Sequence, residues 1–116
     1  MTITARIDAT TRIPETHRAG IIPAPHSVKI ELTGVCDFKC FFCATGQNIR
    51  PKGHMPWELF KTLAKEIRAA GVDEIGLFYL GESMLSPILP DAIRYAKTDC
   101  RFPYVFLTTN GYRATA

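Results

Sequence analysis

The stretch Glu74-Ile-Gly-Leu-Phe-Tyr-Leu80 decides the fold, because it is nearly continuously apolar. A short run of this composition is typical of a strand that is buried on both faces, as in a parallel sheet. The turn Gly81-Glu82-Ser83 ends the run. We therefore expect residues 74–80 to form a strand of a parallel sheet.

Two further segments have the pattern of strands. Residues 27–33, Ser-Val-Lys-Ile-Glu-Leu-Thr, alternate apolar and polar side chains with a period of two, and Gly34 ends the alternation. Residues 104–108, Tyr-Val-Phe-Leu-Thr, form the third candidate, which Asn110-Gly111 closes. The sequence thus predicts three strands.

Helical patterns separate the three predicted strands. From Trp57 to Ala70 the apolar residues recur at spacings of three and four, with Pro56 suited to the first turn and Gly71 to the stop. Residues 87–98 carry a weaker pattern of the same kind, and Pro90 favours a start near residue 88 or 89. Both helices are long enough to serve as crossovers between parallel strands.

The order β-α-β-α-β predicts an α/β fold with parallel strands and right-handed connections. Residues 1–26 are expected to be an irregular lead-in, because three prolines interrupt them. Only a short tail follows the third predicted strand. We therefore expect residues 27–116 to be an incomplete domain, the opening portion of a longer barrel or sheet.

Length and composition narrow the class of protein. The chain has 116 residues, of which 47% are hydrophobic and 22% charged, as expected for one globular domain. The net charge of +3 comes without a run of Lys or Arg, and no apolar stretch is long enough to span a membrane. We expect neither nucleic acid nor a membrane as a partner. Residues 1–20 lack the apolar core of a secretory signal, which predicts a cytoplasmic protein.

The cysteines carry the strongest chemical signal. Cys36, Cys40 and Cys43 form a C-x3-C-x2-C pattern directly after the first predicted strand. Three thiolates on one short loop can converge on one metal centre. Structural zinc sites have four ligands, and here His54 or Cys100 would have to complete the set. An iron–sulfur cubane with only three cysteines would instead leave one iron open to another ligand.

The C-x3-C-x2-C pattern, with the aromatic Phe42 just before the last cysteine, resembles the motif of the radical S-adenosylmethionine (radical SAM) enzymes. The resemblance implies that Cys36, Cys40 and Cys43 hold a [4Fe–4S] cluster. Its fourth iron would bind S-adenosylmethionine, with Phe42 near the adenine. Reductive cleavage would give a 5′-deoxyadenosyl radical that abstracts hydrogen from a substrate.

Two other segments resemble the same family. Leu80-Gly81-Glu82-Ser83 is similar to its G-G-E-P segment, with Leu80 and Ser83 as departures, and residues 107–111 are similar to its T-N-G segment. The resemblance implies a partial (βα)6 TIM-like barrel. All three segments follow predicted strands, so they should meet at one edge of the sheet. The implied cofactor-binding residues are Phe42, Gly81, Glu82, Thr109 and Asn110.

The pattern formed by Pro25, Ser27, Glu31 and Thr33 resembles a radical SAM subgroup with a C-terminal auxiliary-cluster (SPASM-type) domain, which often modifies peptides or proteins. The substrate itself is not predicted beyond a peptide, a protein or a small molecule. An external electron donor such as flavodoxin or ferredoxin is expected. Two alternatives stay open: a zinc-stabilised binding module without catalysis, and an inactive truncated fragment that binds a cluster. Phe41 is expected to pack in the core.

Overall fold

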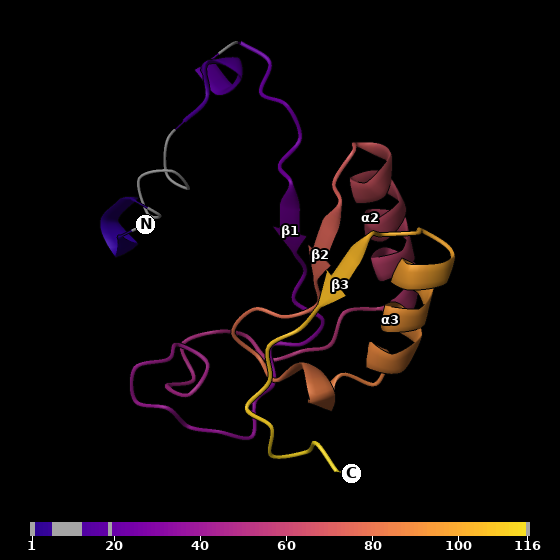
Figure 1. Ribbon diagram of the computed structural model, residues 1–116. Helices are drawn as coiled ribbons and strands as arrows, with labels where there is room; N and C mark the ends of the chain where they lie inside the picture. The colour runs from indigo at the N-terminus through magenta and orange to yellow at the C-terminus, as the bar shows by residue number, and fades with distance from the viewer. Residues whose placement is uncertain (1, 6–12, 19, 116) are drawn as a thin grey trace.

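The computed structural model describes residues 2–5, 13–18 and 20–115. Its centre is a parallel sheet in the order β1-β2-β3, formed by Ser27–Lys29, Glu74–Gly76 and Tyr104–Phe106. Val28 pairs with Ile75, and Ile75 pairs in turn with Val105. The α/β fold class and the parallel β-α-β-α-β order predicted from the sequence are therefore confirmed (Figure 1).

Two helices cover one face of this sheet (Figure 1). Helix α2 runs over Trp57–Ala69 and helix α3 over Leu89–Thr98, within one residue of the predicted ends for α2 and with the predicted start for α3. Gly71 has a φ of 95°, a left-handed conformation that favours glycine and ends α2. The fully buried Phe60 and Ala64 of α2 meet Ala92 and Ala96 of α3 in one core with Ile75.

All three strands are shorter than the sequence predicts, and for β1 the structure shows the reason. After Ile30, whose N–H still donates to Gly76, the chain leaves the sheet and pairs with residues 53–55 instead. Thr33 forms an antiparallel bridge with His54, and Met55 donates its N–H to Leu32. Leu32 is still fully buried. The apolar–polar alternation at residues 31–33 therefore reflects the burial of Leu32 outside the sheet and not the pairing of a strand.

The prediction that residues 74–80 are buried on both faces is wrong for the described chain. Ile75 and Leu77 are fully buried, whereas Phe78 is half-buried and Tyr79 is 60% exposed. Phe78 lies edge-on to Phe106 at 5.7 Å between ring centroids, and the Lys29 ammonium lies 5.4 Å from the Phe78 ring. The face of the sheet away from the helices therefore carries an aromatic cluster that no described helix covers.

The loops that follow the three strands lie at the same end of the sheet (Figure 1). They comprise residues 35–55, the turn with η2 (Ser83–Leu85), and the tail from residue 107. The described segment from η1 (Glu15–Arg18) to β1 lies toward the opposite end, and η1 shows that the lead-in is not wholly irregular. Within the described ranges, no helix is both long and apolar enough to span a bilayer.

Candidate metal and cofactor site

A pocket of about 280 Å³ opens at the carboxyl end of the sheet. It unites the cysteine loop, the turn after β2 and the segment after β3, as expected where parallel strands end. Every site residue predicted from the sequence lines it: Cys36, Cys40, Phe42, Cys43, Gly81, Glu82, Thr109 and Asn110. Phe38, Gly46, Tyr79, Leu80 and Thr108 complete the lining.

The cysteine loop folds tightly back on itself. Cys43 donates its N–H to the carbonyl of Cys40 at 3.1 Å, and Gln47 donates to the carbonyl of Cys43 at 3.1 Å. This turn brings the backbone of Gly46 against Cys40, where a Cβ on residue 46 would lie 2.5 Å from the Cys40 carbonyl oxygen. Only glycine fits here without moving the loop, so Gly46 is a site residue that the sequence reasoning missed.

Backbone N–H groups point at the sulfur atoms. The N–H groups of Thr45 and then Gly46 hold the pKa of the Cys43 thiol below its usual range, and the Arg50 charge adds to this effect. Phe38 donates its N–H to the Cys36 sulfur at 3.5 Å. All four cysteines are free thiols. The loop therefore favours the thiolate of Cys43, and the thiolate is the form in which cysteine binds a metal.

The arrangement does not close around a single ion. Among the residues that the structure describes, no group of three or more His, Cys, Asp or Glu side chains is placed to hold one metal ion. One zinc ion needs all its sulfur ligands within about 2.3 Å. The three thiolates of a cubane bind three different irons, so their sulfurs stand farther apart. His54 and Cys100, the candidates for a fourth zinc ligand, do not line the pocket.

The carboxylate of Glu82 joins two of the three loops. It is only 3% exposed, and it accepts hydrogen bonds from the Thr109 hydroxyl at 2.7 Å, the Asn110 N–H at 2.8 Å and the Met84 N–H at 3.1 Å. A buried carboxylate needs such donors to offset its lost hydration. Glu82 therefore ties the turn after β2 to the segment after β3.

Gly81 packs directly on the chain that leaves β1. A Cβ at residue 81 would collide with the carbonyl of Thr33, and the next residue, Glu82, donates its N–H to the carbonyl of Val35 at 2.8 Å. The glycine is thus required by packing against residues 33–35. It also leaves the backbone bare on the side of the pocket.

Comparison with known proteins decides the family. Residues 30–116 match the family model described as the radical SAM superfamily, which covers most of the chain. This chain belongs to the radical SAM superfamily. Members of this superfamily are enzymes that use a [4Fe–4S] cluster and S-adenosylmethionine. The donor set of three free thiols around one pocket fits that requirement.

One curated relative and one solved structure are similar to this radical SAM chain. An S-adenosylmethionine-dependent nucleotide dehydratase of Lacinutrix mariniflava is 37% identical over an alignment of 76 residues, and the match covers 61% of this chain and 16% of that protein. The crystal structure of BtrN in complex with AdoMet and 2-DOIA has a TM-score of 0.67 at 21% identity, over 78% of this chain and 37% of that one. The chain therefore spans a minor part of both proteins, and the second likeness supports the fold.

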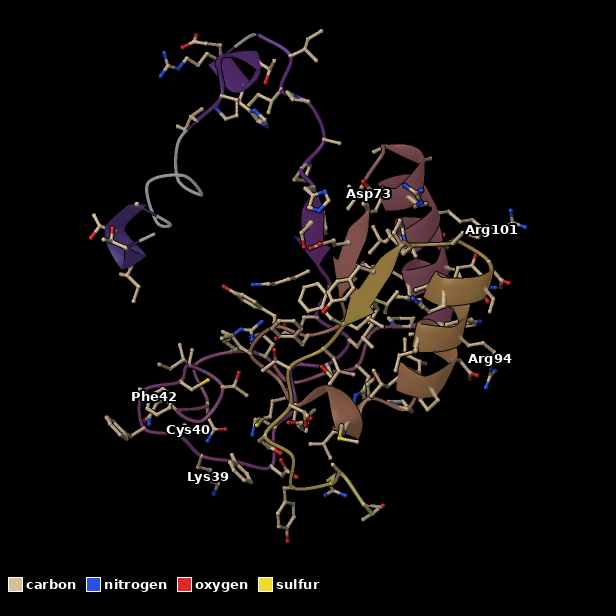
Figure 2. The ribbon with its side chains drawn as sticks, viewed as in Figure 1. Lys39, Cys40, Phe42, Asp73, Arg94 and Arg101 are labelled. Carbon is tan, nitrogen blue, oxygen red and sulfur yellow. The ribbon has the colours of Figure 1, made fainter. Side chains whose placement is uncertain are left out.

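The aromatic residues of the radical SAM motif lie on the outside of the loop. Phe42 is 79% exposed, lines the pocket and meets Phe41 edge-on at 5.3 Å. Figure 2 shows Phe42 and Cys40 on this loop, at the far end of the molecule from Asp73, which precedes β2. The prediction that Phe41 packs in the core is wrong, because its side chain is 84% exposed.

Asp37 is a second residue that the sequence reasoning missed. Its carboxylate accepts hydrogen bonds from Asn110 Nδ2 at 3.0 Å and Arg113 Nε at 3.1 Å, which join the cysteine loop to the segment after β3. The bond from Asn110, followed by that from Arg113, lowers the pKa of Asp37. An acidic residue next to the first cysteine was the available signal, but its partners lie more than seventy residues away.

Glu31 is the third missed residue in this radical SAM chain. It forms an ion pair with Arg50, and hydrogen bonds from that guanidinium are the main cause of a lowered Glu31 pKa. The sequence reasoning used Glu31 only as part of a subgroup pattern and gave Arg50 no role. Both side chains are in fact partly buried.

Proposed function

We propose that this chain is the cluster-binding part of a radical SAM enzyme, in which Cys36, Cys40 and Cys43 ligate the [4Fe–4S] cluster. The observation that carries the proposal is the single pocket that these cysteines share with the turn after β2 and the segment after β3. With both groups bound, the pocket would support radical chemistry: reductive cleavage of S-adenosylmethionine would give a 5′-deoxyadenosyl radical that abstracts hydrogen from a substrate.

The residues of the chain bind and orient in this proposal. The cysteines bind as thiolates, and the N–H groups of Thr45 and Gly46 stabilise the negative charge on Cys43. Gly81 leaves its backbone open toward S-adenosylmethionine, and Phe42 offers a ring for the adenine. Glu82 keeps Thr109 and Asn110 in place, so its carboxylate acts through its neighbours rather than on the substrate.

The substrate belongs to the proposal as well. The subgroup pattern around Glu31 favours a peptide or protein, whereas the name of the relative, a nucleotide dehydratase, adds a nucleotide as a small-molecule candidate. Radical SAM enzymes need a reductant in addition to a substrate, and we propose flavodoxin or ferredoxin in that role. A cytoplasmic location fits, because reducing compartments keep cysteines available as metal ligands.

The direct test is anaerobic reconstitution with iron and sulfide, followed by metal analysis and chromatography for 5′-deoxyadenosine after reduction with dithionite. We expect iron and sulfide in equal amounts and S-adenosylmethionine-dependent formation of 5′-deoxyadenosine. Colourless protein with one zinc ion would overturn the proposal in favour of the binding module. A cluster without any cleavage would overturn the catalytic part and favour the inactive fragment.

A further inference from the structure

The carboxylate of Glu31 lies where three segments of the chain meet. Its Oε1 atom accepts hydrogen bonds from the backbone N–H of Leu80 at 2.9 Å, from that of Gly81 at 3.0 Å, and from Arg50 Nη1 at 2.9 Å. Its Oε2 atom accepts from Arg50 Nη2. Glu31 thereby connects the exit of β1 to the turn after β2 and to the end of the cysteine loop.

Arg50 extends this connection to the last cysteine. Its guanidinium forms the two parallel bonds to Glu31 and donates a third to the Thr45 hydroxyl at 3.4 Å. Thr45 is buried and follows Cys43 by two residues in the same tight turn. The ring centroid of Tyr79, in the turn after β2, lies 6.0 Å from the guanidinium carbon. Arg50 therefore contacts both segments that Glu31 joins.

We propose that Glu31 and Arg50 are a positioning pair, which sets the Cys43 segment and the Leu80–Gly81 backbone in one fixed register. The inference rests on the proposed function, since Cys43 is taken as a cluster ligand and Gly81 as part of the S-adenosylmethionine site. Neither Glu31 nor Arg50 lines the pocket, so the pair acts through Thr45, Leu80 and Gly81. A bidentate carboxylate–guanidinium pair suits this role, because its planar fork fixes orientation as well as distance.

Burial makes the pair sensitive to loss of one partner. The side chains of Glu31 and Arg50 are 21% and 29% exposed. Removing Arg50 leaves a partly buried carboxylate with only its two backbone donors, and removing Glu31 leaves a partly buried guanidinium facing Thr45. Both variants break the same connection, so their effects on the binding of S-adenosylmethionine should not add.

The test uses Arg50→Gln, Glu31→Gln, the double variant and Arg50→Lys in the full chain, each reconstituted anaerobically. Arg94→Gln is the matched control, because Arg94 also pairs with a carboxylate but is exposed on α3, away from the pocket (Figure 2). The readouts are iron content, the dissociation constant of S-adenosylmethionine by anaerobic calorimetry, and the change that S-adenosylmethionine causes in the EPR spectrum of the reduced cluster.

Both single variants should keep the iron content of the wild type, because all three cysteines remain. We expect each to weaken S-adenosylmethionine binding about tenfold, the size of effect that loss of a charge-assisted pair produces. The double variant should bind no more weakly than the weaker single variant. Arg50→Lys keeps the positive charge but loses the planar pair of donors. Compared with Arg50→Gln, it should recover part of the binding and of the EPR change.

Unchanged binding in both single variants would overturn the inference, as would a double variant whose loss is the product of the two single losses. A lower midpoint temperature of thermal unfolding in Arg50→Gln, with unchanged binding of S-adenosylmethionine, would show that the pair has a purely structural role. If Glu31→Gln fails to fold, the Arg50 variants decide by the same criteria. Failure of the wild type to bind cluster or S-adenosylmethionine would instead overturn the proposed function, so the two failures are distinguishable.

Discussion

Two carboxylates, the buried one of Glu82 and the partly buried one of Glu31, hold the loops of this radical SAM chain together. Glu82 and Glu31 each accept hydrogen bonds from backbone N–H groups of a neighbouring loop, and both lie where the strands end. Water would otherwise separate these irregular segments, because loops have few apolar contacts of their own. The residues that define the pocket therefore owe their positions to a small number of charge-assisted hydrogen bonds.

Replacing Glu82 by Gln should destabilise the fold. The amide keeps one acceptor oxygen but places its NH2 donor against either the Thr109 hydroxyl or the Asn110 N–H, which donate to different oxygens of the carboxylate. We expect a loss of about 1–3 kcal/mol in the free energy of unfolding, measured by urea denaturation of the metal-free chain. Glu58→Gln, on the exposed face of α2, is the control and should cost far less. Equal losses in the two variants would contradict the role of Glu82.

The assignment of the cluster ligands predicts that replacing different cysteines has opposite effects on iron content. Cys40→Ala should abolish cluster binding, because two thiolates seldom hold a cubane. Cys100→Ala should leave iron content unchanged, because Cys100 packs against the core at the end of α3 and is remote from the pocket. Iron and sulfide analysis after anaerobic reconstitution measures both. Full iron content in the first variant, or a large loss in the second, would refute the ligand set.

At the scale of elements, the helices followed the sequence closely and the strand ends did not. Helix α2 begins and ends where its apolar period, Pro56 and Gly71 predict, since these signals act within one or two turns. Strand β1 loses its last residues because Leu32 and Thr33 pair with residues 53–55, a partner that local alternation cannot reveal. Element type was therefore predictable, whereas the point at which each strand leaves the sheet was not.

The cysteine loop offers a test at this same scale. Gly46→Ala would place a Cβ 2.5 Å from the carbonyl oxygen of Cys40, so the turn that gathers the cysteines must open. We expect a clear loss of iron on reconstitution, with far-ultraviolet circular dichroism unchanged because the helices are distant. Gly53→Ala is the matched control, since nothing lies within 4 Å of the Cβ it adds. Similar iron contents in the two variants would show that the tight turn is not required.

At the scale of the whole molecule, long-range polar contacts make stability depend on pH. The pKa of Glu31 is lowered from 4.5 by its bonds to Arg50, with smaller contributions from the N–H groups of Gly81 and Leu80. A group whose pKa is lower in the folded state stabilises the fold above its unfolded pKa, and this contribution is lost as the pH falls through the folded value. The chain should therefore lose stability as the pH falls below about 4.5.

Urea midpoints of the metal-free chain between pH 7 and pH 3 measure this dependence. The wild type should be more stable than Arg50→Gln at pH 7, and the difference should shrink as Glu31 becomes protonated. Arg94→Gln, which breaks an exposed pair, should show only a small difference at pH 7. A difference between wild type and Arg50→Gln that stays constant down to pH 3 would contradict the role of the ion pair.

By itself, the sequence determined the α/β order, the positions of both helices and the three segments that meet at the pocket. It could do so because periodicity, Pro and Gly signals and the cysteine spacing are local, and because parallel strands present their carboxyl ends at one edge. Only the tertiary structure decided which side chains join the loops. Asp37, Glu31 and Arg50 find their partners across the fold, and such pairings depend on how distant segments meet in space.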